Sequence, residues 1–347
     1  MEHISELKSS LNGYFGWNKA RITCFVNMLL GLFITRSINL NKLACVFASD
    51  AEQTSRYRRL QRFFEKFKID YDMIAGFIFR LFFVAGGKWY LAIDRTNWQW
   101  GKSDINILTL AIVFKGTAIP IYWELLDKKG NSDTSERIAL LKKFIGRFGK
   151  EGILGVLADR EFIGGDWFKW LLAEKIAFYI RIRNNTVTTN SRGLSVDIDA
   201  LFYGLKPQEQ RILEGKRKIM GCELYLAGLM LSDGELLIIA TSEPPDDAIK
   251  TYGLRWEIDT HVTDGDRIKK LFVLLAIAFC WAHKMGEWRH EITPIKIKKH
   301  GRPAVSLFRY GLDYITNAVV KVFYQPNLFK NCLEKIYVLG IRPEMCR

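Results

Sequence analysis

Two aspartates in this sequence directly follow short apolar runs that are typical of buried β-strands. Asp94 comes after Trp89–Ile93, and Asp159 comes after Ile153–Ala158. Acids at the carboxyl ends of central strands lie where active sites open in α/β sheets, although both could be solvated turn residues. Two close carboxylates repel each other unless a cation lies between them, and their oxygens suit Mg²⁺ or Mn²⁺. The pair therefore predicts a metal site of the kind used to cut or join phosphodiesters.

A third acid for such a site could come from the segment Asp246–Thr260. If this segment is helical, Tyr252, Arg255 and Asp259 share one face at spacings of three and four residues. Glu257 then points about 160° away from Asp259. We expect Asp259 to act as the third catalytic acid, and Tyr252 and Arg255 to hold phosphates. The alternative for Tyr252 and Arg255 is ordinary packing and a surface ion pair.

The two aspartates need a sheet that brings their strands together. Three strand-like runs come first, and a helix follows them with a capping-box pattern of Asp133 and Glu136 at its start and Gly149 at its end. Strands and helices then alternate, which gives the order β-β-β-α-β-α-β. This order predicts an α/β fold with a mixed sheet covered by helices, in which the first and fourth strands can be neighbours. The predicted elements are strands 89–93, 105–114, 118–125, 153–158 and 177–182, with helices from 133 and over 164–175.

The flanking sequence differs from this core in its composition. Residues 1–85 show helical patterns, residues 184–245 read as a β-rich insertion, and helices resume at Asp246. The predicted organisation has five segments: a helical DNA-binding region at 1–85, the first part of the core at 86–183, the insertion at 184–245, the final core helices at 246–288, and a basic C-terminal region at 289–347.

The chain is strongly basic, with a net charge of +14 over 347 residues. This charge favours nucleic acid as a partner, although a basic protein without such a partner fits it too. In the run Arg56–Lys68, apolar side chains share one helical face, and Arg58, Arg59 and Arg62 lie largely on the other, where they can contact phosphates or simply face solvent. Arg181 and Arg183, at the end of a predicted strand, are two further candidates for binding DNA.

Several other classes of protein are disfavoured by the sequence. The six cysteines form no CxxC pair and no zinc-binding pattern, and they are typical of reduced thiols in a cytoplasmic protein. The longest apolar runs are shorter than a membrane span, so we expect buried helices and no membrane partner.

The motifs resemble the DDE transposases of bacterial insertion sequences, in the branch called the insertion sequence four family. The matching stretches include YLAIDRTNWQWG, LADREFIGGDWFKWL and YGLRWEI, and the resemblance covers nearly the whole chain. It implies an RNase H-like core with a β-rich insertion, a helical DNA-binding region, and cut-and-paste transposition with Mg²⁺. It also implies double-stranded DNA at transposon ends and target DNA as partners, bound by a homodimer.

In this resemblance Asp94 and Asp159 match the first two acids, and Tyr252 and Arg255 match the start of the family's Tyr-Arg-Glu-Lys signature. The places of the glutamate and the lysine hold Asp259 and Asp266. We infer, by comparison with the family pattern, an internal deletion of roughly fifteen residues, about four helical turns. The shorter side chain of Asp259 then predicts weak or absent catalysis.

Three functions follow from these observations. The first is a DNA transposase that cuts and transfers strands with metal held by Asp94 and Asp159. The second is a DNA-binding remnant without catalysis that occupies transposon ends or inhibits intact subunits. The third is a nuclease with the same core that needs no specific ends.

Overall fold

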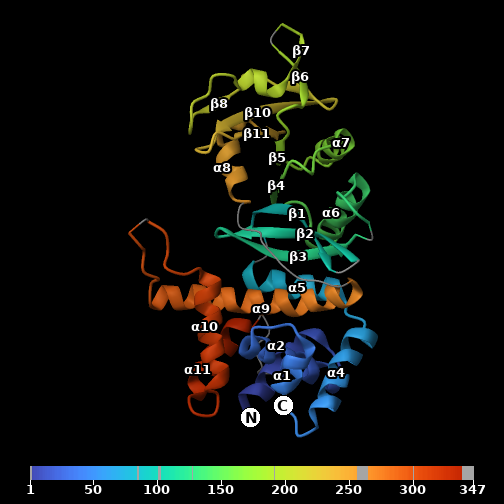
Figure 1. Ribbon diagram of the computed structural model, residues 1–347, viewed down its shortest axis with the longest axis vertical. Helices are drawn as coiled ribbons and strands as arrows, with labels where there is room; N and C mark the ends of the chain where they lie inside the picture. The colour runs from blue at the N-terminus through green and yellow to red at the C-terminus, as the bar shows by residue number, and fades with distance from the viewer. Residues whose placement is uncertain are drawn as a thin grey trace. The chain divides into compact units, whose positions relative to one another are not determined.

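The computed structural model describes residues 2–83, 86–100, 103–126, 128–190, 192–255, 265–299 and 301–337. The chain divides into two compact units (Figure 1). The first, called here the helical unit, comprises Met1–Phe83 and Gly265–Arg347, and the second, called the sheet unit, comprises Val84–Asp264.

The helical unit combines both ends of the chain. The prediction of helices in residues 1–85 is confirmed, and the long helix α9 packs against α2, α4, α5, α10 and α11. The residues of α9 at 265–288, assigned to the core by the sequence, therefore pack in this unit. The helices are α1 (Glu2–Phe15), α2 (Lys19–Thr35), α3 (Leu40–Cys45), α4 (Gln53–Lys66), α5 (Tyr71–Phe82), α9 (Gly265–Ile292), α10 (Leu307–Val320) and α11 (Pro326–Ile336).

Helix α9 packs against five other helices of this unit, so most of its apolar side chains are buried. Its stretch Lys269–Ile292 is long and apolar enough to cross a membrane by length and composition, but 78% of the apolar window is buried inside the protein. The expectation of a buried core helix here is confirmed.

Helices α9 and α10 cross in close contact at two glycines. A Cβ on Gly286 would lie 1.9 Å from the carbonyl oxygen of Leu307, and a Cβ on Gly311 would lie 1.8 Å from that of Ala282. Only glycine fits at such a crossing, because any larger side chain would push the two backbones apart.

Helix α4 is amphipathic, as the sequence predicts. Leu60, Phe63 and Phe64 are buried, whereas Arg58, Arg59, Arg62 and Lys66 are exposed. The helix begins at Gln53, three residues before the run that starts at Arg56, and its exposed face carries the arginines.

The sheet unit is built on nine strands in the order β3-β2-β1-β4-β5-β11-β10-β8, with β9 paired to β10, which can be followed in Figure 1. Strands β1, β2 and β3 are antiparallel neighbours, and β4 and β5 run parallel to β1. This is an RNase H-like mixed sheet with helices at both ends of the chain, so the predicted fold class is confirmed. Its strands are β1 (Trp89–Trp100), β2 (Ser103–Phe114), β3 (Thr117–Leu125), β4 (Ile153–Ala158), β5 (Phe178–Ile182), β8 (Gln210–Ile212), β9 (Arg217–Ile219), β10 (Cys222–Met230) and β11 (Leu236–Thr241).

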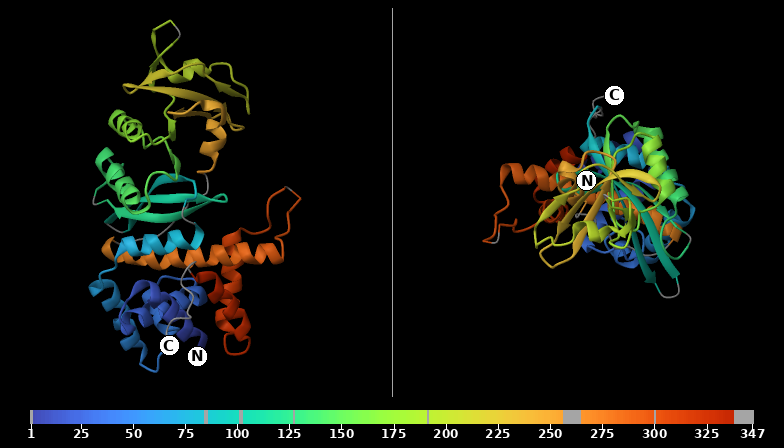
Figure 2. Two further views of the ribbon diagram at one scale, coloured as in Figure 1. Left: turned by 180° about the vertical axis from the view of Figure 1, so that it is seen from behind. Right: turned by 90° about the horizontal axis from the view of Figure 1, so that it is seen from above.

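Three helices of the sheet unit cover its faces. The capping box of Asp133 and Glu136 opens α6 (Thr134–Phe148), and Gly149 ends it, both as predicted. Figures 1 and 2 show α6 and α7 (Gly165–Ala173) on one face of the sheet and α8 (Ala248–Gly253) on the other.

The predicted insertion is rich in strands but is continuous with the core. Strand β11 pairs antiparallel with β5, so that β11, β10 and β8 extend the core sheet. A separate small sheet is formed by β6 (Val187–Thr189) and β7 (Ser195–Asp197), followed by the 3₁₀ turn η1 (Ile198–Phe202); a second 3₁₀ turn, η2 (Pro245–Asp247), precedes α8.

Two predicted boundaries are wrong. Strand β1 does not end before Asp94 but continues to Trp100, because its polar second half pairs with β2 in an antiparallel ladder. Helix α8 ends at Gly253, a residue type with low helix propensity, so Arg255 follows the helix instead of continuing its face.

The net charge is carried by one of the two units. The helical unit contains 27 Lys and Arg against 13 Asp and Glu, which accounts for the whole +14 of the chain. The sheet unit contains 24 of each and is neutral. The electrostatic attraction for a polyanion therefore comes from the helical unit.

Candidate active site

The sheet places the two predicted aspartates side by side. Strands β1 and β4 pair in parallel up to Ile93 and Ala158, and Asp94 and Asp159 are the next residues on each strand. Asp94 therefore lies within β1, at the point where its parallel pairing with β4 ends, and not at the end of the strand. The predicted neighbourhood of the two strands is confirmed.

Arg255 links the two carboxylates. Its Nη2 atom lies 2.9 Å from Oδ1 of Asp94 and 3.7 Å from Oδ2 of Asp159. Its side chain is largely buried, as is that of Asp94, and its Nε has no hydrogen-bond partner among the described residues. The positive charge of Arg255 thus lies close to both carboxylates and reduces the repulsion between them.

Burial and the neighbouring charges act in opposite directions on Asp94 and Arg255. Burial raises the pKa of Asp94, and the guanidinium of Arg255 opposes this shift. Burial would lower the pKa of Arg255, but the neighbouring Asp94, Tyr252 and Asp159 raise it overall. A nearby cation therefore favours the charged form of Asp94.

Tyr252 holds the segment that carries Arg255. Its side chain is only 1% exposed and packs with Ala92, Leu157 and Ile239 in the core. Burial raises its pKa to about 12, so the phenol stays protonated at neutral pH. The buried ring of Tyr252 anchors the chain three residues before Arg255.

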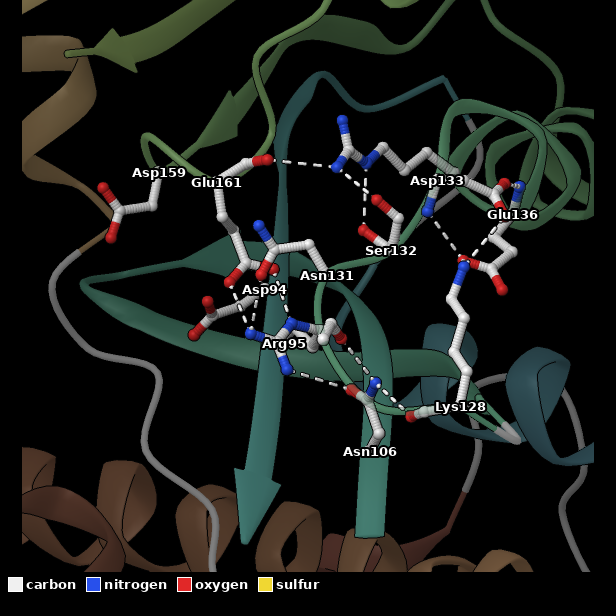
Figure 3. Close-up of polar contacts among 12 residues, drawn as sticks. Asp94, Arg95, Asn106, Lys128, Asn131, Ser132, Asp133, Glu136, Asp159 and Glu161 are labelled. Carbon is white, nitrogen blue, oxygen red and sulfur yellow. Dashed lines mark hydrogen bonds and ion pairs between the residues drawn. The ribbon is translucent and has the colours of Figure 1, made fainter. Parts of the chain in front are cut away.

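A second cluster of polar side chains lies beside the aspartates (Figure 3). Arg95 pairs with Glu161 through bonds of 2.8 Å and 3.0 Å, and it also donates to Asn106 and Asn131 at 3.2 Å each. Asn106 in turn donates to the carbonyl oxygens of Lys128 and Gly130. These bonds join β1 and β2 to the loops after β3 and β4.

The loop that carries Asp159 is fixed by Arg137 of α6. This buried side chain donates to the carbonyl oxygens of Glu161 at 3.0 Å and Ile163 at 3.4 Å, and to the hydroxyl of Ser132 at 2.9 Å. It also lies over the ring of Phe162, 5.0 Å from its centroid. Asp159 is further oriented by the backbone N–H of Arg160, which donates to its Oδ1.

The carboxylates fit one cation that prefers oxygen ligands. The position of Arg255 shows that a single positive centre can approach oxygens of both Asp94 and Asp159. Among the residues that the structure describes, no group of three or more His, Cys, Asp and Glu is placed to hold a metal ion. The donor set present is therefore a pair of hard oxygen ligands suited to Mg²⁺ or Mn²⁺, with a guanidinium as its competitor.

The other predicted site residues are distributed as follows. Asp259, Glu257 and Asp266 lie outside the residues whose side chains are described. Arg181 is 8% exposed and pairs with Glu235, whereas Arg183 is exposed. Arg58, Arg59 and Arg62 belong to the helical unit, and Arg59 lies over the ring of Phe47, 5.9 Å from its centroid.

Sequence reasoning missed the cluster of Arg95, Asn106, Glu161 and Arg137. One signal was present: Asn106 is a lone amide in the apolar run of β2, and a buried amide needs partners. A second signal is Glu161, an acid only two residues after Asp159.

A mixed sheet with aspartates on two neighbouring parallel strands fits a DDE-type site. Residues 85–259 match the family described as "Transposase DDE domain". Because this match spans half of the chain, the chain belongs to the transposase DDE domain family. Transposases of this family act on DNA, and they generally depend on divalent metal ions.

The fold is similar to a solved structure titled "Cryo-EM structure of piggyBac transposase synaptic complex with hairpin DNA", with 11% identity and a TM-score of 0.44, covering 98% of this chain and 84% of that one. A comparison with curated proteins gave no match.

Proposed function

We propose that this chain is a transposase of the insertion sequence four branch that binds DNA and cuts it weakly with Mg²⁺ or Mn²⁺. The observation that carries this proposal is the meeting of Asp94 and Asp159 on neighbouring parallel strands, joined through Arg255. The family match supports the class of reaction.

Each described residue has a role in this proposal. Asp94 and Asp159 hold the metal ion, and the Arg95–Glu161 pair and Arg137 keep their loops in place. A divalent ion held by these two carboxylates would supply Lewis-acid chemistry for phosphodiester cleavage. Arg255, released from the carboxylates, pairs with a DNA phosphate.

DNA binding is assigned mainly to the helical unit. It carries the whole net charge, and Arg58, Arg59 and Arg62 project from the exposed face of α4. Arg183 is exposed in the sheet unit, and with Arg181, Tyr252 and Arg255 it stays a candidate for contacts near the cleaved bond. The partners are double-stranded transposon ends and target DNA, bound by a homodimer in the cytoplasm.

Weak cleavage is expected because the inferred deletion, between Ile258 and Asp259, removes the family's glutamate and lysine. Asp259 then stands in the register of the glutamate, with a side chain one methylene shorter. A displacement of about 1 Å in a catalytic group can lower the rate about 100-fold.

The test is a cleavage assay on DNA that carries the inverted repeats flanking the gene. We expect slow nicking with Mg²⁺ or Mn²⁺ that is lost in Asp94→Asn and Asp159→Asn and kept in Asp133→Asn. Cleavage as fast as that of an intact family member would show that the deletion argument is wrong, and cutting without specific ends would indicate a nuclease.

A second candidate function is a DNA-binding remnant without catalysis. The observation that favours it is Arg255, which neutralises both carboxylates from within the chain. It predicts DNA binding that is unchanged by Asp94→Ala and no cleavage with any metal. Inhibition of an intact transposase in a mixture of the two proteins would support it further.

A further inference from the structure

A basic hairpin follows α9 in the helical unit, and it is seen in orange beyond the end of that helix in Figure 2. It is called here the basic arm and comprises residues 295–299 and 301–304. Ile297 bridges Pro303, the N–H of Lys298 donates to the carbonyl of Arg302, and the N–H of Ala304 donates to the carbonyl of Lys296. Gly301, with a φ of 79°, lies in the turn that joins the two sides.

The base of the arm is fixed to the helices. Ile295 is 8% exposed, and its N–H donates to Nδ1 of His290 at 2.9 Å. Tyr310 of α10 donates to the carbonyl of Thr293, and its ring lies 4.2 Å from the guanidinium carbon of Arg289. The arm is therefore a formed element, and a ligand would not have to order it on binding.

The charge of the arm has one sign. Lys296, Lys298, Lys299 and Arg302 are all exposed. The sequence contains no Asp or Glu from residue 292 to residue 312. The arm therefore presents four cations within seven residues to the solvent.

The pairing of the two sides brings like charges together. Lys298 lies directly opposite Arg302, and Lys296 precedes Lys298 by two residues, so that the three side chains share one face of the hairpin. Like charges directly opposite each other destabilise a β-ladder. A polyanion bound along this face would remove that repulsion.

We propose that the basic arm binds the phosphate backbone of duplex DNA as a contact separate from α4. This inference rests on the proposed function, since it assumes that the protein binds DNA. Lys296, Lys298 and Arg302 would contact phosphates without reading the base sequence, because backbone contacts position a protein and do not specify bases. The arm lies in the unit that carries the whole net charge.

The test compares two triple variants of the full chain. The first carries Lys296→Gln, Lys298→Gln and Arg302→Gln. The control carries Lys19→Gln, Lys321→Gln and Lys330→Gln, three exposed cations elsewhere in the helical unit. Fluorescence anisotropy measures the binding of a labelled duplex from about 50 to 200 mM salt.

Three lost phosphate contacts should weaken binding at least tenfold at about 0.1 M salt and reduce the slope of log K against log salt by about 2 to 3. We expect the control to bind more tightly than the arm variant and with a steeper slope. Equal affinity and slope in the two variants, with circular dichroism showing both folded, would overturn the assignment of the arm and leave the proposed function intact.

Two other results are informative. If the wild-type protein does not bind duplex DNA at any salt concentration, the proposed function fails together with the arm. If the arm variant loses binding to phosphatidylserine vesicles while its affinity for DNA is unchanged, the arm is a lipid contact and the proposal is wrong. Restoration of tight DNA binding by arginine at positions 296 and 298 would support a charge-based contact.

Discussion

The substitution Arg255→Gln should destabilise the sheet unit more than any exposed arginine can. Arg255 and Asp94 are both mostly buried, and their charged atoms lie 2.9 Å apart. Two unit charges about 4 Å apart attract by about 4 kcal/mol at an effective dielectric constant of 20. Removing one partner of a buried pair costs about 3–5 kcal/mol, because the other charge stays buried. We expect a loss of about 3 kcal/mol at pH 8.

The loss should become smaller as the pH falls. Burial already raises the pKa of Asp94 above its usual 3.8, and the loss of Arg255 raises it further. Between the unfolded and the folded pKa the folded state binds more protons than the unfolded state, so stability falls as the pH rises through this window. At low pH Asp94 is protonated in both states, and the missing guanidinium matters little.

The assay is urea unfolding with pulse hydrogen exchange at a fixed labelling pH, read on peptides from β4. The control is Arg147→Gln, an exposed arginine on α6 that should change stability by less than about 0.5 kcal/mol. An equal effect of the two substitutions, or a loss for Arg255→Gln that is the same at pH 4 and pH 8, would refute the reasoning.

Three further predictions concern the elements around the site and the helical unit. Gly311→Ala should destabilise the helical unit by about 1–3 kcal/mol, because its Cβ would meet the carbonyl of Ala282. The control Gly13→Ala has open space around it and should be neutral or stabilising by up to about 1 kcal/mol. Urea unfolding compares the two variants. Arg137→Met should speed hydrogen exchange in the loop after β4, since its bonds to two carbonyls are lost, and unchanged exchange there would contradict its role. Asp133→Ala should remove the helix cap at a cost of about 1 kcal/mol at pH 7. Lys128, Ser135 and the helix N–H hold the pKa of Asp133 well below its usual 3.8, so that cost should shrink as the pH falls below the usual pKa and disappear only below the lowered one.

Local patterns gave most of the sheet correctly. The capping box of α6 and the neighbourhood of β1 and β4 both follow from short stretches of sequence. An acid after an apolar run does not by itself end a strand, because β2 supplies hydrogen bonds to the residues that follow Asp94 and β1 continues to Trp100. Pairing with a neighbour outweighed local propensity.

The contacts around the aspartates could not be predicted in the same way. Arg137 binds carbonyl oxygens of residues 161 and 163, and such bonds between distant segments leave no spacing pattern in the sequence. Arg255 lies just beyond the end of α8 and pairs with Asp94, which is 161 residues earlier in the chain. The residues that carry charge were identifiable, but their partners depended on the tertiary fold.

The most direct test of the account is metal-dependent nicking of end-containing duplex DNA. We predict slow nicking by the wild-type chain with Mn²⁺, loss of nicking in both Asp94→Asn and Asp159→Asn, and nicking at the wild-type rate in Asp133→Asn. Nicking that continues unchanged in Asp94→Asn and Asp159→Asn would contradict the account, because the cut would then come from a site other than this pair.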